Sequence, residues 1–99
     1  MKLRIRGNSL RLRLNQPEVE KLATEGLVKE TVEFGAQEKL EYVLESSTAV
    51  SEICGNFAGG IIKILLPAQL AKEWAKGDEI GLEAIQESGE TKVLKILIE

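Results

Sequence analysis

The chain has 99 residues, of which 43% are hydrophobic, so it is long enough to bury the thin core of one small domain. Its single cysteine excludes an intramolecular disulfide, and the lack of histidine removes the commonest general base and metal ligand. The net charge is -3, but residues 1–17 hold five cations and no acid, whereas residues 18–99 hold 8 lysines and 16 acids.

Residues 2–14 have the sequence KLRIRGNSLRLRL, in which apolar and charged side chains alternate as in half-buried strands. Gly7 and Asn8 interrupt the alternation and both tolerate a positive φ, so the pattern predicts a two-residue hairpin turn. The face that this register turns inward carries Leu3, Ile5, Leu10, Leu12 and Leu14. The outward face carries every arginine of the chain and one lysine: Lys2, Arg4, Arg6, Arg11 and Arg13. A slip of one residue would mix the two sets, so the alternation specifies the register.

A helix is predicted directly after this hairpin. Asn15 is a favourable N-cap, and Glu18 is placed for a reciprocal capping contact. Gly26 is a favourable stop, because glycine accepts the left-handed conformation that ends many helices. Two strands are then expected at residues 28–34 and 39–45.

The second half of the chain repeats this order after a polar connector at residues 46–51. Gly59 and Gly60 predict a second hairpin turn. The inward face of this hairpin would carry Phe57, Ile62, Ile64 and Leu66. The elements that follow are a helix at residues 67–76 and strands at residues 78–85 and 91–98. The last strand is almost wholly apolar, so we expect it to be covered on both faces.

These elements predict a mostly β protein with two short helices, built as a duplicated ββαββ chain. Residues 1–45 form the first unit and residues 52–99 the second, within one domain that spans residues 1–99. One unit of about fifty residues would leave strand edges exposed and would lack a closed core, whereas two units together can bury both.

The segment GNSLRLRL, followed by a capped helix, resembles the start of the AbrB and MazE-type transcription factors and antitoxins. In the second half, the Leu66-Pro67 junction, the helix and the GDEI sequence at residues 77–80 resemble the later part of the same pattern. In that superfamily two ββαββ chains interlock through exchanged hairpins. The resemblance therefore implies a swapped-hairpin barrel that is a pseudo-dimer in one chain. The opening residues also resemble a set of small uncharacterised bacterial proteins, for which no activity is implied.

The chain departs from the family pattern in one way that bears on function. The second hairpin carries no arginine, so a single basic hairpin would face DNA where a symmetric homodimer presents two. The positions that match DNA-contacting positions of the family are Arg4, Arg6, Asn8, Ser9 and Arg13. Arg11 joins this set because strand spacing places it on the same face.

Two other interpretations of the cations are open. The acidic body could neutralise them internally, through one of the acids on predicted strands: Glu33, Glu41, Glu45 or Glu83. The interpretation that the sequence favours is an interaction module for a protein partner or a second copy, with a DNA-binding regulator or antitoxin-like protein as the alternative. Ile61 and Leu65 would then form an outward apolar contact on the second hairpin. The sequence names no DNA site and no toxin partner.

The sequence contains no strong catalytic or phosphate-binding motif. Cys54 has no histidine to activate it and is interpreted as a packed thiol on a strand. The glycines of the second hairpin serve a turn and do not form a phosphate-binding loop. The sequence therefore predicts a non-enzymatic protein with no cofactor, no metal and no membrane contact. No apolar run reaches membrane-spanning length, and we expect a cytoplasmic protein.

Overall fold

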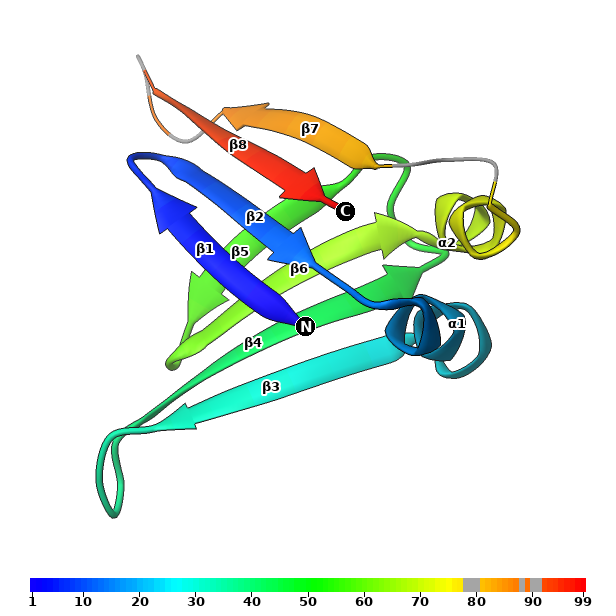
Figure 1. Ribbon diagram of the computed structural model, residues 1–99. Coiled ribbons are helices and arrows are strands. Elements are labelled where there is room, and N and C mark those ends of the chain that lie inside the picture. The colour runs from blue at the N-terminus through cyan, green and yellow to red at the C-terminus, as the bar shows by residue number, and fades with distance from the viewer. Residues whose placement is uncertain (78–80, 88, 90–91) are drawn as a thin grey trace.

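The computed structural model describes residues 1–77, 81–87, 89 and 92–99, and Figure 1 shows how the elements are arranged. In chain order they are β1 (Lys2–Arg6), β2 (Ser9–Arg13), α1 (Gln16–Glu25), β3 (Leu27–Glu33), β4 (Lys39–Ser47), β5 (Cys54–Ala58), β6 (Ile61–Pro67), α2 (Ala68–Ala75), β7 (Leu82–Glu87) and β8 (Val93–Ile98). The predicted class, mostly β with two short helices, is confirmed. The GDEI sequence and the turn at Ser88-Gly89 lie partly outside the described residues.

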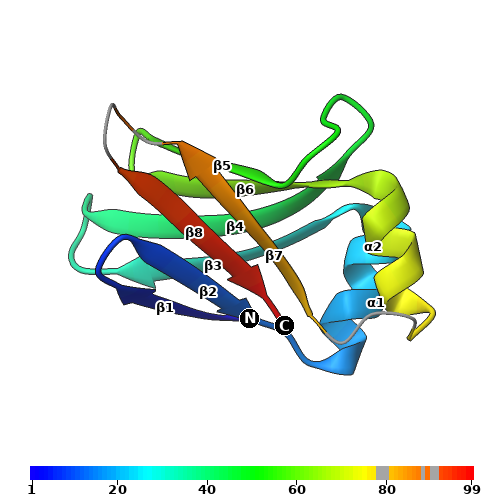
Figure 2. The ribbon, with the colours of Figure 1, turned by 90° about the horizontal axis from the view of Figure 1, so that it is seen from above.

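The strands form two four-stranded sheets, with the strand orders β1-β2-β8-β7 and β3-β4-β6-β5. Each hairpin is antiparallel, whereas the two hairpins of a sheet meet through a parallel pair, β2 with β8 and β4 with β6. Each sheet therefore combines one hairpin from the first half of the chain with one from the second. The two helices pack against each other at one end of the sheets (Figure 1, Figure 2).

The N-terminal hairpin has the register that the alternation predicts. Leu3 pairs with Leu12 and Arg4 pairs with Arg11 across the two strands. Gly7 begins the turn with a φ of 56°, a left-handed conformation that glycine adopts without steric cost. The register matters for function, because it fixes which side chains the hairpin turns away from the core.

Both helices begin and end where local chemistry favours it. In α1, the Glu18 N–H donates to Asn15 Oδ1 at 2.9 Å and the Asn15 N–H donates to Glu18 Oε1 at 3.0 Å, so the predicted capping box is present. Gly26 ends α1 with a φ of 80°. Pro67 is the N-cap of α2, and Gly77 follows that helix with a φ of 85°.

The core lies between the two sheets and the helices. Its most completely buried side chains are Leu12, Leu22, Leu44, Ile64, Leu66, Ile96 and Ile98. Trp74 on α2 is also buried, as its spacing from Leu70 predicts. Three of the hairpin residues expected inside, Leu3, Leu10 and Leu14, are partly buried and pack against this core.

The two sheets do not close into the barrel that the family resemblance implies. Both are open, and at the β5 and β7 edges they are joined by a side chain. Gln86 Oε1 accepts a hydrogen bond from the Gly55 N–H at 2.7 Å, and Gln86 Nε2 donates to the Gly55 carbonyl at 2.8 Å. The side-chain amide of Gln86 thus links two sheet edges. In a closed barrel, a continuous ladder of backbone hydrogen bonds would join them.

Three expectations about burial are wrong. Ile5 and Phe57 are 59% and 66% exposed, because they lie near the hairpin tips, beyond the part of the interior that the opposite sheet covers. The strand β8 is covered on one face only. Its residues 94, 96 and 98 are partly or fully buried, whereas on the other face Val93 and Lys95 are exposed and Leu97 is only partly buried. The outward face of the β1-β2-β8-β7 sheet is therefore open.

We expect the Leu12→Ala substitution to lower the free energy of unfolding by about 2–5 kcal/mol, because it leaves a cavity at a fully buried position. The matched control is Ile5→Ala on the facing strand, which should cost less than about 1 kcal/mol because Ile5 is mostly exposed. Urea denaturation measures both values. Equal losses in the two variants would contradict the hairpin's placement.

A second prediction concerns the close approach at Gly55. A Cβ added there would lie 2.8 Å from Ile64 Cδ1 and 3.4 Å from Ile96 Cδ1, so Gly55→Ala should destabilise the protein by about 1–3 kcal/mol. Gly35→Ala is the control, since no atom lies within 4 Å of a Cβ at that position. Thermal melts should separate the two alanine variants. Indistinguishable melting temperatures would rule out the tight contact between β5 and the core.

Candidate nucleic-acid interface

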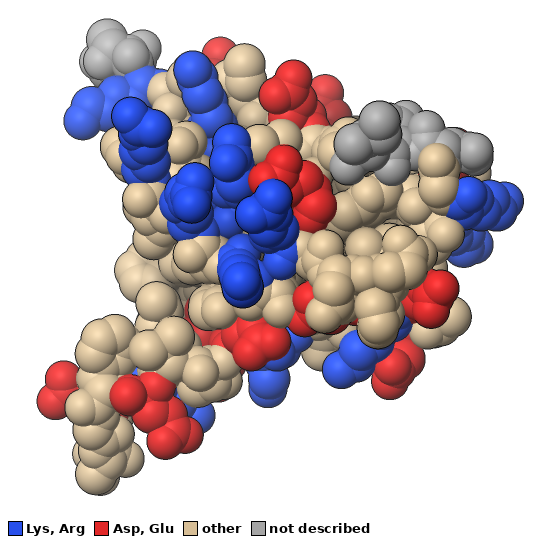
Figure 3. Space-filling model, viewed as in Figure 1, with Lys and Arg blue, Asp and Glu red and all other residues tan. Residues whose placement is uncertain are grey.

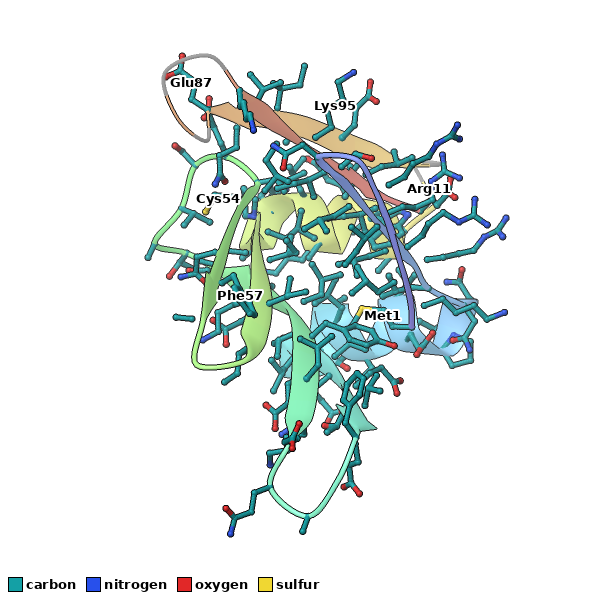
Figure 4. The ribbon with its side chains drawn as sticks, turned by 90° about the vertical axis from the view of Figure 1, so that its left-hand side faces the viewer. Met1, Arg11, Cys54, Phe57, Glu87 and Lys95 are labelled. Atoms are coloured by element: carbon teal, nitrogen blue, oxygen red, sulfur yellow. The ribbon has the colours of Figure 1, made fainter. Side chains whose placement is uncertain are left out.

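The N-terminal hairpin presents a cationic surface on the outward side of its sheet. We call this surface the basic face and define it as the side chains of Lys2, Arg4, Arg6, Arg11 and Arg13, all of which are exposed. Figure 3 shows lysine and arginine side chains gathered over β1 and β2. In Figure 4, Arg11 points away from the side chains packed between the sheets. The strand alternation thus separates an apolar inner side from a cationic outer side.

The register of the hairpin brings like charges together. Arg4 lies directly opposite Arg11, and Lys2 lies directly opposite Arg13. Opposed side chains on antiparallel strands have Cβ atoms about 5 Å apart. Two unit charges at a similar separation in water repel by at most about 1 kcal/mol, and long exposed side chains can hold the charges further apart. Nearby acids, solvent or a bound anion must offset this repulsion.

Among the described residues, one acid forms ion pairs with the basic face. Glu99 directly follows β8, and its backbone continues the parallel pairing with β2: its N–H donates to the Leu12 carbonyl at 2.8 Å and its carbonyl accepts from the Leu14 N–H at 2.7 Å. Glu99 Oε1 consequently lies 3.6 Å from Arg11 Nε and 3.9 Å from Arg13 Nε. A single carboxylate is shared by two guanidinium groups, at the long end of ion-pair distances.

The other cations of the basic face have no such partner. Lys2, Arg4 and Arg6 form no ion pair with any residue in the described part of the chain. Their charges therefore face solvent, and the surface has a higher density of positive charge than the net charge of the protein suggests.

Internal neutralisation by the acids named from the sequence is not observed. Within the described ranges, Glu33, Glu41, Glu45 and Glu83 form no ion pair with an arginine. The first three lie on the other sheet, where Glu41 contacts Lys39 at 3.5 Å. Glu83 is on β7, and the strand β8 separates it from the hairpin. Sheet topology, which composition does not reveal, keeps these acids away.

Asn8 and Ser9 were predicted to contact DNA, and the structure gives both side chains partners within the protein. Asn8 Nδ2 donates to the Val93 carbonyl at 2.7 Å, which ties the hairpin turn to the start of β8. Ser9 Oγ donates to the Arg6 carbonyl at 2.7 Å and closes the turn itself. These two residues position the basic face.

Two hollows mark the outward side of the sheet. A small one, of about 180 Å³, is bounded by Lys2, Leu3, Arg4, Arg11 and Arg13. A larger one, of about 630 Å³, extends from β2 across β8 to β7, and we call it the outer groove. Its outward-pointing lining residues are Ser9, Arg11, Glu83, Ile85, Lys95 and Leu97. Arg11 belongs to both hollows, so they adjoin.

Apart from Glu83, the residues of β7 and β8 do not stand out in the sequence as part of the site. Lys95, Leu97 and Glu99 lie beside the hairpin because β8 pairs in parallel with β2, although the two strands come from opposite ends of the chain. Ile85 lies one strand further away, on β7, which pairs with β8. The alternation of Val93, Lys95 and Leu97 with buried residues is visible in the sequence. Because most residues of this strand are apolar, the sequence predicts burial on both faces, and the alternation does not stand out.

The N-terminus, at the start of β1, is held by two acids, Glu18 and Glu30. The ammonium group of Met1 donates to the Glu18 carboxylate and, at 3.4 Å, to Glu30. Burial alone would raise the pKa of Glu18, but hydrogen bonds from that ammonium and from the Asn15 N–H lower it below its usual value. Burial, together with the charges of Glu30 and Glu18, raises the pKa of Tyr42, whose hydroxyl donates to the Met1 carbonyl at 3.2 Å.

The remaining candidate residues lie on the other sheet. Ile61 and Leu65, the predicted protein contact, are partly exposed on the outward side of β6, on either side of Lys63. Cys54 is a free, partly buried thiol that pairs with Leu65 across β5 and β6. Among the described residues, no group of three or more acids or cysteines is placed to hold a metal ion. Nor does any helix of the described chain have the length and apolarity to cross a membrane.

Comparison with protein-family profiles matches residues 1–99 to DUF7009, which is described as a family of unknown function. Searches of curated proteins and of solved structures gave no match. Because the match extends over the full 99 residues, the chain belongs to the DUF7009 family.

Proposed function

We propose that this protein binds duplex DNA through the basic face, as a non-enzymatic protein of the AbrB and MazE type in which two ββαββ units are fused in one chain. The observation that carries the proposal is the cluster of cations that the fold leaves largely unneutralised. Arg4 and Arg11 repel each other, and Arg4 has no acidic partner in the described chain. Exposed cations clustered on one surface without acidic partners are the electrostatic footprint expected of an anion-binding site.

The arrangement of hairpins supports the duplicated architecture. Each sheet holds one hairpin from each half of the chain, as two interlocked units would require. The two parallel pairs also correspond: Leu12 of β2 lies opposite Ile98 of β8, as Ile64 of β6 lies opposite Leu44 of β4, and all four side chains are buried. A common ancestry of the halves explains why both the strand order and the core repeat.

The chemistry of the basic face favours nucleic acid among anions. Four of its five cations are arginines, whose planar guanidinium groups match phosphate and guanine edges better than lysine does. The hairpin forms one edge of a four-stranded sheet, so its cations face a duplex from the outward side of β1 and β2, where they can meet phosphates along the groove edges. On this arrangement Arg4, Arg6, Arg11 and Arg13 contact the duplex, while Asn8 and Ser9 hold the turn in shape.

Salt titration tests this proposal. If all five cations of the basic face meet phosphates, log affinity should fall against log salt with a slope of at most about -4 to -5. The Arg4→Gln/Arg6→Gln double variant should make that slope shallower by about two units. Its melting temperature should not fall, because the substitution removes the repulsion between Arg4 and Arg11 and breaks no ion pair in the described chain.

The matched control is Lys29→Gln/Lys72→Gln, which removes the same net charge from β3 and α2. The control should keep the wild-type slope. Fluorescence anisotropy with a labelled duplex at low salt provides the measurement. Absence of binding at low salt, or an equal change of slope in the control, would show that the basic face is not a DNA site.

A second candidate is contact with a protein partner or with a second copy through Ile61 and Leu65. The supporting observation is that both side chains stay partly exposed on a central strand, where the corresponding positions of the first hairpin are Ser9 and Arg13. If the chain self-associates through them, Ile61→Ser/Leu65→Ser should lower the sedimentation mass to that of a single chain. An unchanged oligomeric mass would exclude self-association through Ile61 and Leu65.

A further inference from the structure

The outer groove has two chemically distinct ends. At the β2 end Arg11 lies opposite Arg4, and the small cationic hollow begins there. At the β7 end the exposed apolar side chain is Ile85, which is 71% exposed, and Leu97 on β8 lies between the two ends. Lys95 on β8 lies beside Ile85, so the groove combines cations at its β2 end and centre with apolar surface at Leu97 and Ile85. Neither DNA binding nor core packing requires this combination.

The size of the groove suits a small molecule. Its volume of about 630 Å³ falls within the range of about 300–1,000 Å³ that is typical of ligand pockets. From β2 to β7 the groove crosses two interstrand spacings, or about 10 Å. A short alkyl or aryl group attached to an anionic head would span this distance.

We propose that the outer groove binds a small amphipathic anion, with its anionic head at Arg11, next to Arg4 of the adjoining small hollow, and its apolar body on Leu97 and Ile85. Charge complementarity selects the orientation. Glu83 lines the far end of the groove and would repel a second anionic group, so the apolar part of the ligand lies toward β7.

Two acids on β7 favour a free ligand over a membrane surface. Glu83 and Glu87 both point outward on β7, beside the apolar floor. An anionic bilayer pressed against the basic face would meet these carboxylates, whereas one small molecule inside the groove avoids Glu87. The occupant is therefore a monomeric amphipathic anion, such as an alkyl phosphate.

Glu99 competes with this ligand. Its carboxylate lies 3.6 Å from Arg11 Nε, at the head end of the groove. A bound anion would take over part of this contact. Removing the charge of Glu99 should therefore strengthen ligand binding, a direction of change that a general loss of structure does not produce.

Octyl phosphate, kept below its micelle concentration, is a direct probe. Isothermal titration calorimetry should show binding that is at least about tenfold tighter than that of inorganic phosphate or of the neutral octyl glucoside, because each of these lacks one half of the interaction. Equal binding of octyl glucoside and octyl phosphate would overturn the proposal. So would binding to vesicles of anionic phospholipid without binding to monomeric octyl phosphate.

Variants assign the two ends of the groove. Arg11→Gln and Ile85→Ser should each weaken octyl phosphate binding by about tenfold, and Glu99→Gln should tighten it. Phe57→Ser is the matched control for Ile85→Ser, since Phe57 is 66% exposed at a site outside the groove. Equal affinities of Phe57→Ser and Ile85→Ser would contradict a site on β7 and β8.

The test separates this inference from DNA binding, although both use Arg4 and Arg11. Ile85→Ser should lose octyl phosphate affinity and keep the wild-type salt slope with duplex. Arg6→Gln alone should weaken duplex binding and leave octyl phosphate binding unchanged, because Arg6 does not line either hollow. Failure of one proposal therefore leaves the other standing.

Discussion

The parallel pairing of β2 with β8, and of β4 with β6, is the interaction on which the rest of the structure depends. Neither half of the chain contains a complete sheet, because each hairpin finds its neighbour in the other half. The pairing aligns Leu12 with Ile98 and Leu44 with Ile64, and all four side chains are buried. The pairing that joins two hairpins into a sheet therefore also aligns core side chains, and the two helices cover one end of the sheets.

The same pairing determines the chemistry of the outward surface. Parallel alignment with β8 brings Lys95 and Leu97 beside the N-terminal hairpin and places Glu99 near Arg11. The corresponding strand pair in the other sheet sets Glu41 beside Ile61 and Val43 beside Lys63, so its outward surface has no comparable cluster of cations. One fold thus presents two related surfaces, and the arginines gather on one of them.

The sequence predicted local structure well and long-range placement poorly. The turn at Gly7, the register of Arg4 with Arg11 and the capping box at Asn15 all follow from short-range rules and are confirmed. Ile5 and Phe57 were placed inside because alternation gives the face of a strand but not how far the opposite sheet extends.

The composition of the site was also only partly predictable. The cations of the hairpin were identified from alternation alone. Their relation to Glu99 and to the outer groove depends on which strand pairs with β2, and no local pattern in the sequence carries that information. For the same reason, the acids chosen as neutralising partners were the wrong ones: they lie on another sheet or across β8.

Complementation of fragments tests the central claim most directly. Residues 1–49 and 50–99 would be produced separately, divided within the exposed turn near Thr48 and Ala49. If hairpins from both halves are needed to build each sheet, neither fragment should melt cooperatively as a monomer, and an equimolar mixture should recover the circular dichroism and cooperative melt of the intact chain. A fragment of residues 1–49 that folds cooperatively as a monomer would contradict the account.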